Sequence, residues 1–157
     1  MRFTGAYLFG LGAVVLGLSP LPVAAQKDKD DAKARAPFQG AWNVVKLEIM
    51  GQDVTAAIKD MPATMSFDGN KYVFDIGPET EKGTFTFDAK AKPATLDLKI
   101  LEGRGKGKSQ LAVYEVEGDT LKICMADEDA KDRPKKLASE KGGAGMVMFT
   151  LTRKKKD

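Results

Sequence analysis

Few side chains of this chain could do chemistry. Its 157 residues include no histidine and one cysteine, Cys124, in the stretch YEVEGDTLKICMADEDAKDRP. A thiol reacts as the thiolate, and lowering its pKa toward neutral pH needs a nearby cation, a histidine or a helix N-terminus. Without histidine, the chain also lacks the base of Ser-His and Cys-His catalysis and a common metal ligand. We therefore expect no catalytic residue, no cofactor and no metal site. An enzyme ranks last, with only carboxylate mechanisms left open.

Cys124 is better explained as a structural residue. In a strand it shares a face with Lys122 and lies opposite Leu121 and Ile123. It therefore points away from the face that we expect to form the core. A lone cysteine excludes an intramolecular disulfide. We expect the thiol to pack as a small apolar group under the long segment that begins at Ala126.

The segment EGRGKGKS, residues 102–109, resembles a phosphate-binding loop because it ends in Gly-Lys-Ser. That loop needs a glycine at its first position, where this chain has Glu102, and a helix after it. A strand is predicted to follow instead, so no helix N-terminus would face the anion. A flexible basic hairpin tip is the better interpretation. Weak contact with an anion stays open at Arg104, Lys106 and Lys108.

The acidic residues do not form a recognisable site either. The segment DEDAKD, residues 127–132, resembles a calcium loop, but the required glycine and glutamate are replaced by Asp132 and Ala138. Asp97 alternates with the apolar face of its strand, and Asp119 lies in a turn. Paired carboxylates must face each other across a cleft to act as acid and base. We assign neither residue a catalytic role.

Short strands are the elements that would position these residues. Period-two patterns with turn residues between them, such as DGN at 68–70 and Gly-Asp at 118–119, predict eight strands. The strands cover residues 41–49, 63–67, 71–76, 83–88, 95–101, 109–117, 120–125 and 146–153. Only the connections 51–62 and 126–145 are long. We predict an all-β fold, an eight-stranded antiparallel up-and-down (lipocalin-like) barrel, with a two-sheet sandwich as the alternative.

Large apolar side chains would fill much of this barrel. An eight-stranded barrel is either filled by its side chains or holds one small ligand, and the number of bulky groups favours a filled or narrow interior. The expected interior residues are Tyr72, Phe74, Phe85, Phe87, Leu98, Ile100, Leu111, Val113, Leu121, Ile123, Phe149 and Leu151.

The ends of the chain predict export. Residues 1–25 have a short basic start, an apolar run and small residues at the expected cleavage site, so we predict a signal peptide. A retained membrane anchor is the alternative. Residues 26–37 lack large apolar side chains and are predicted to be a flexible charged linker. The barrel would span 38–153, followed by a basic tail at 154–157. We expect a periplasmic or extracellular monomer with no membrane span after cleavage.

Two sets of residues resemble known proteins. Gly40-Ala41-Trp42 opens the first strand and Arg153 ends the last. This arrangement is similar to the lipocalin-like (calycin) barrels, where the tryptophan closes one end of the barrel and a basic side chain covers it. The resemblance implies that Trp42 and Arg153 form such a barrel-closing pair. A guanidinium over an indole contributes about 0.5–2 kcal/mol.

A second resemblance covers nearly the whole domain. GAWNVVKLE, KPATLDL, YEVEGDTLKIC, RP and LTR follow one another in this order. The series resembles an uncharacterised family of exported domains expanded in planctomycete bacteria, and it departs from that pattern at Ala41 and Leu96. The family has no established activity, so no catalytic residue is implied. Its motif residues here are Gly40, Asp97, Tyr114, Gly118, Asp119, Cys124, Arg133 and Pro134.

The sequence thus favours a non-catalytic binding module for a small hydrophobic ligand or another exported protein. The alternative is a side-chain-filled structural or interaction domain with no ligand. The formal charge of +3 comes from interspersed charges, and no aromatic or helical basic surface accompanies the tail. We therefore expect no nucleic acid partner.

Overall fold

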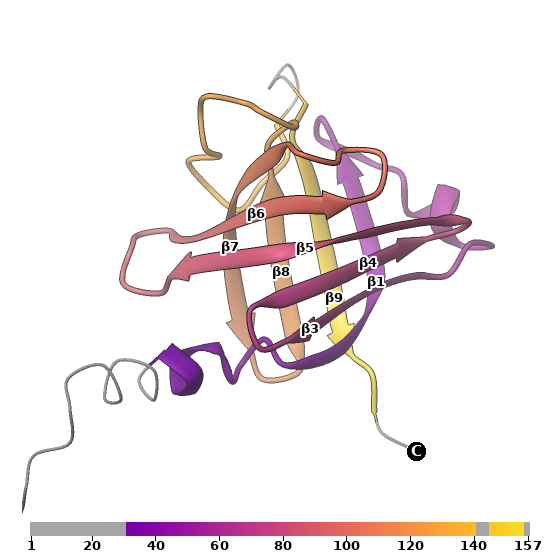
Figure 1. Cartoon of the computed structure of the whole chain (residues 1–157). Helices are drawn as coiled ribbons and strands as arrows, with labels where there is room; N and C mark the ends of the chain where they lie inside the picture. The colour runs from indigo at the N-terminus through magenta and orange to yellow at the C-terminus, as the bar shows by residue number, and fades with distance from the viewer. Residues whose placement is uncertain (1–30, 141–144, 156–157) are drawn as a thin grey trace, which may run out of the picture.

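The computed structural model describes residues 31–140 and 145–155, and the described part is dominated by strands (Figure 1). One short 3-10 helix, η1, interrupts the strands in these ranges. The elements are β1 (Gly40–Ile49), β2 (Gln52–Asp53), η1 (Thr55–Ile58), β3 (Ala63–Asp68), β4 (Lys71–Ile76), β5 (Glu79–Asp88), β6 (Ala94–Glu102), β7 (Ser109–Glu117), β8 (Thr120–Met125) and β9 (Val147–Arg153).

The sheet closes on itself. Each strand from β3 to β8 pairs antiparallel with the next. β3 also pairs with the first half of β1, and β9 pairs with β1 from Trp42–Arg153 to Ile49–Val147. Eight strands, β1 and β3 to β9, therefore form a closed barrel. This confirms the predicted all-β, eight-stranded antiparallel up-and-down barrel and not the sandwich. The extra strand β2 pairs with the last two residues of β1.

The two ends of the barrel differ. The β7–β8 turn and the start of β1 lie at one end, toward the bottom of Figure 1, and the longer β6–β7 and β8–β9 connections lie at the other. The first end is called the closed end below, because buried side chains fill it. The second end is called the mouth, and it is bordered by the β4–β5, β6–β7 and β8–β9 connections.

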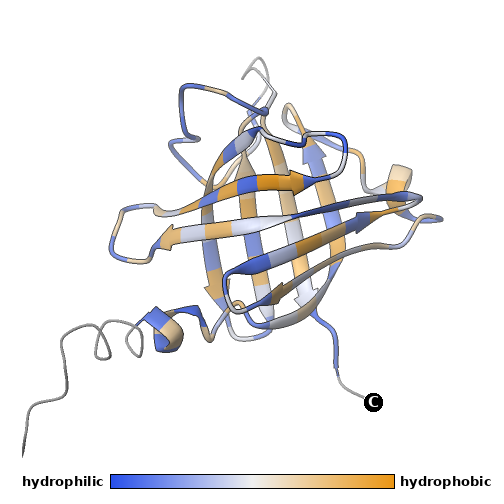
Figure 2. Ribbon diagram, in the orientation of Figure 1, coloured by the Kyte–Doolittle hydropathy of each residue, from blue (hydrophilic) through white to orange (hydrophobic). Residues whose placement is uncertain are grey.

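Apolar side chains from alternate strand positions fill the interior, and this alternation is visible along the strands in Figure 2. The prediction is wrong for two of the expected interior residues, which lie on the outer face of β7. Val113 packs in a second cluster with Cys124 and Met148, and Leu111 shares the same face of the strand. Ala112 and Tyr114 face the interior instead. Both faces of β7 are apolar because the β8–β9 connection covers the outer one, so alternation alone could not decide which face lies inside.

Some predicted segments fall partly or wholly outside the described residues. The predicted signal peptide, 1–25, lies outside them, as do residues 26–30 of the predicted linker and the last two residues of the tail. Within the described ranges, residues 31–35 form a short helical turn before β1. None of the helical segments in these ranges has the length and apolar character that a membrane crossing requires.

Candidate functional site

The closed end is built around Trp42. Its side chain has 0% exposure, and its Nε1–H donates a hydrogen bond of 2.7 Å to the Phe38 carbonyl. The Arg153 guanidinium lies over the indole, 4.1 Å from the ring centroid. Arg153 also donates to the carbonyls of Gln39 (2.6 Å) and Pro37 (2.9 Å), and its Nε lies 3.1 Å from Asp119. One side chain thus joins the chain before β1, the indole and the β7–β8 turn.

Phe38 plugs the same end. It is 1% exposed, and its ring lies 4.7 Å from that of Tyr114 and 5.4–5.6 Å from those of Phe67, Phe85 and Phe87, centroid to centroid. Tilted aromatic pairs at these distances stabilise a core beyond their buried area. The closed end is therefore a packed aromatic core.

A second set of motif residues lies on the outer wall of the barrel. Arg133 Nη2 lies 2.6 Å from Asp97 Oδ1, and Arg133 Nη1 donates to the carbonyls of Leu96 (3.2 Å) and Ala112 (2.7 Å). The guanidinium therefore fixes the β8–β9 connection to strands β6 and β7. The next residue, Pro134, is buried.

Cys124 lies beneath this connection. The thiol is fully buried and donates a weak hydrogen bond of 3.5 Å to the Ala138 carbonyl. Burial raises the pKa of the Cys124 thiol, and this contact opposes the rise only in part. A buried thiol with a raised pKa is a poor nucleophile. Its surroundings are those of a packing residue.

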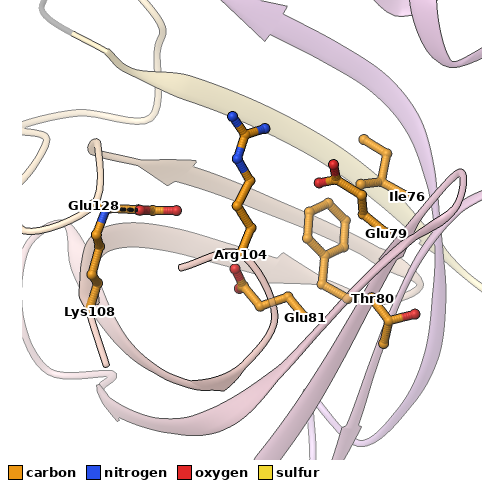
Figure 3. A pocket seen from close by; sticks show the side chains of 8 residues that line it. Ile76, Glu79, Thr80, Glu81, Arg104, Lys108 and Glu128 are labelled. Atoms are coloured by element: carbon orange, nitrogen blue, oxygen red, sulfur yellow. Dashed lines mark hydrogen bonds and ion pairs between the residues drawn. The ribbon is translucent and has the colours of Figure 1, made fainter. Parts of the chain in front are cut away.

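The mouth holds a pocket with a volume of about 780 Å³ (Figure 3). Its lining changes in character from one element to the next: apolar on β4, acidic on β5, and charged on the two connections that follow. The lining residues are Phe74, Ile76, Glu79, Thr80, Glu81, Arg104, Lys108 and Glu128.

Glu81 links the pocket to the core. It pairs with Phe74 across the β4–β5 ladder, and its Oε1 accepts a hydrogen bond of 2.8 Å from the Tyr72 hydroxyl. Burial raises the pKa of Glu81, the charge of Glu128 adds to the rise, and the bond from Tyr72 opposes it. Burial and the Glu81 carboxylate together raise the pKa of Tyr72, so the phenol stays a donor.

Arg104 is held at the rim by an ordered loop. Four backbone hydrogen bonds of 2.9–3.2 Å fold residues 103–108 back onto Ile100. Gly103 has a positive φ of 108°, and a Cβ there would lie 2.9 Å from the Thr80 carbonyl oxygen. A Cβ on Gly105 would lie 2.6 Å from the Ile100 side chain. The glycines thus let the loop pack against β5 and the core, and the backbone of Arg104 lies between them beside the pocket.

The charges at the mouth are only partly paired. Lys108 Nζ lies 2.7 Å from Glu128 Oε2, and this contact raises the pKa of Lys108. Among the described residues, neither Arg104 nor Glu79 forms an ion pair. In Figure 3 the Arg104 guanidinium is directed away from the Glu81 carboxylate. The mouth therefore offers an unpaired cation and an unpaired acid to an incoming molecule.

The structure separates the residues singled out from the sequence. Gly40, Trp42, Tyr114, Gly118, Asp119 and Arg153 gather at the closed end, while Asp97, Cys124, Arg133 and Pro134 lie on the outer wall. None of them lines the mouth. Of the pocket's polar residues, only Arg104 and Lys108 were candidates for ligand contact.

Glu79, Glu81 and Glu128 were missed. A signal for Glu81 was present, because it stands four residues before Phe85 in the same alternation. Strand β5 begins four residues earlier than predicted, at Glu79, and this extension places both glutamates at the rim.

Across residues 31–140 and 145–155, no group of three or more His, Cys, Asp or Glu side chains could hold a metal ion. No protein-family model, curated protein or solved structure matches the chain. The fold and the pocket define the protein as a small closed β-barrel with a packed closed end and a pocket at its mouth.

Proposed function

We propose that the protein is a non-catalytic binding module that holds a small, partly apolar ligand at the mouth of its barrel. The observation that carries the proposal is the pocket of about 780 Å³, which falls in the range of about 300–1,000 Å³ typical of small-molecule sites. The predicted signal peptide supports a role outside the cytoplasm, as an exported carrier or sensor.

The composition of the pocket supports a ligand with both apolar and polar parts. Phe74 and Ile76 provide an apolar surface, and the Phe74 ring packs edge-on against Phe149 at 5.4 Å. Charged side chains surround this surface at the rim. A purely apolar ligand would desolvate these charges without replacing their hydrogen bonds, which is costly. The proposed ligand therefore places its apolar part on β4 and its polar part at the rim.

The alternative is a side-chain-filled domain with no ligand. The packed rings around Phe38 favour it for the closed half of the barrel. That half cannot admit a ligand without displacing several aromatic side chains, so the proposal is confined to the mouth.

The test combines native mass spectrometry with a binding assay. Protein purified from its own host should carry an additional small mass. The purified protein should also bind the neutral fluorescent probe Nile red. Ile76→Glu places a charge on the apolar lining and should weaken Nile red binding about tenfold, since it removes much of one aliphatic contact.

Leu101→Glu is the matched control. Leu101 is 46% exposed and does not line the pocket, so it should leave the affinity unchanged. Equal effects of the two substitutions would place the probe elsewhere. If Nile red does not bind and repeated preparations carry no additional mass, the filled domain without a ligand is the better account.

A further inference from the structure

We propose that the ligand of the mouth is a small zwitterion with an apolar arm, whose acidic group is held by Arg104 and whose ammonium group is held by Glu81 and Glu79. This inference rests on the proposed binding function and specifies its ligand class. It follows from the positions of three kinds of side chain around one pocket.

Arg104 supplies the anion-binding half. Its guanidinium has no ion pair among the described residues, and the backbone hydrogen bonds of its loop hold residue 104 at the rim of the pocket. Guanidinium groups bind carboxylates and phosphates through two parallel hydrogen bonds. The neighbouring cation, Lys108, is already paired with Glu128 at 2.7 Å, so Arg104 is the cation left for a ligand.

Glu81 and Glu79 supply the cation-binding half. They lie two residues apart on β5 and both line the pocket. The Tyr72 hydroxyl donates to Oε1 of Glu81 and so orients that carboxylate, which leaves Oε2 for another donor. No cation of the described residues pairs with either glutamate. An ammonium group would provide the missing donors.

The balance of charge argues against a ligand with a single charge. The lining contains three glutamates against one arginine and one lysine, so a simple anion would meet a net negative surface. A simple cation would leave the exposed Arg104 guanidinium without a partner and would gain nothing from it. A zwitterion satisfies both groups without adding net charge.

The apolar arm would lie on Phe74 and Ile76. These residues stand on β4 directly opposite Glu81 and Glu79 in the ladder, so the apolar and acidic surfaces are adjacent. Two sources share the required chemistry: short peptides with free ends and apolar side chains, and lipids with an aminophosphate headgroup.

Four dipeptides that share one scaffold separate the contributions of the two ligand charges to the affinity. Leucyl-leucine is a zwitterion, N-acetyl-leucyl-leucine an anion, leucyl-leucine amide a cation, and N-acetyl-leucyl-leucine amide is neutral. Each is titrated into the full purified protein by calorimetry and by displacement of Nile red. The zwitterion should bind tightest, with each lost charge weakening binding about tenfold, as expected for one charge-assisted hydrogen-bonded contact.

The variants assign each charge to its residue. In Arg104→Gln, dipeptides with a free carboxylate should no longer bind more tightly than those without one, while dipeptides with a free ammonium group should still bind more tightly. Glu81→Gln, which retains an acceptor for Tyr72, should do the reverse. Lys99→Gln removes an exposed cation of β6 outside the pocket and should change neither preference.

Lysophosphatidylethanolamine and lysophosphatidylglycerol, below their micelle concentrations, test the lipid source. A preference for the first lipid, sensitive to both variants, with no binding of the dipeptides supports the zwitterion and assigns it to a lipid. Nile red binding with no preference among the charges overturns this inference and leaves the proposed function standing. A preference for a singly charged probe overturns it too. If no probe binds, both proposals fail.

Discussion

Replacement of Arg153 by methionine should destabilise the protein by about 2–3 kcal/mol. The side chain donates to two backbone carbonyls, and each hydrogen bond to a charged group contributes about 1.5–3 kcal/mol when buried. The contact with the indole adds about 0.5–1 kcal/mol at a partly exposed site. The pair with Asp119, whose side chain is 77% exposed, adds little. The low end of this sum is about 3.5 kcal/mol. Because Arg153 is itself 30% exposed and methionine still covers the ring, solvent screening reduces the expected loss to about 2–3 kcal/mol.

The assay is equilibrium unfolding in urea, followed by fluorescence. Trp42 is the only tryptophan, so the signal reports directly on the closed end. Arg153→Lys keeps the charge but not the forked geometry, and it should cost about 1–2 kcal/mol. Lys154→Met is the control, because Lys154 is exposed and adjacent, and it should cost less than about 0.5 kcal/mol. Equal midpoints for Arg153→Met and Lys154→Met would refute the argument.

Three further predictions concern the core, the outer wall and the mouth. Phe38→Ala should cost about 3–5 kcal/mol in the same urea assay, because it opens a cavity among four rings; a cost below about 1 kcal/mol would mean that Phe38 is not a plug. Cys124 should resist thiol reagents in the native protein, and Arg133→Gln should accelerate its labelling several-fold by releasing the covering connection; unchanged labelling would mean that Arg133 does not hold it. Because the raised pKa of Glu81 makes the folded state bind more protons than the unfolded state, stability should fall as pH rises from the ordinary carboxyl range through that raised pKa. Glu81→Gln should remove this fall in urea melts across pH, and the same slope in wild type and variant would contradict the assignment.

The barrel could be predicted from the sequence because its determinants are local. Period-two alternation defines the strands, and turn residues such as Gly118-Asp119 define their connections. An up-and-down order then requires the last strand to pair with the first, so Trp42 and Arg153 must be neighbours if the barrel closes. The structure places them opposite each other in the β1–β9 ladder.

Which face of β7 lies inside the barrel could not be predicted, because both of its faces are apolar. Alternation divides a strand into two faces but does not say which one is inside. Val113 is buried on the outer face by the β8–β9 connection, and Ala112 is buried on the inner face. Nothing in the local sequence distinguishes these two environments. Phe38 was missed as a plug for a related reason, since it precedes the first strand and belongs to no alternation.

The mouth could not be predicted because its residues come from distant parts of the chain. Phe74 of β4 and Glu128 of the β8–β9 connection both line the pocket. These two elements come together only when the barrel closes. No spacing in the sequence reports such a meeting. Glu81 is the exception, because its place in the alternation of β5 could have revealed an acid on the inner face.

The residues that stabilise the closed end are different from those that line the mouth, so substitutions at the mouth can be interpreted as effects on binding. Arg104 and Glu79 are exposed and make no ion pair with other described residues, so their replacement should leave the free energy of unfolding within about 0.5 kcal/mol of wild type. A loss of binding in Arg104→Gln therefore reports on the ligand and not on folding. Glu81 differs, because its carboxylate bonds the buried Tyr72. Only a substitution that keeps an acceptor, such as glutamine, separates its part in binding from its part in the core.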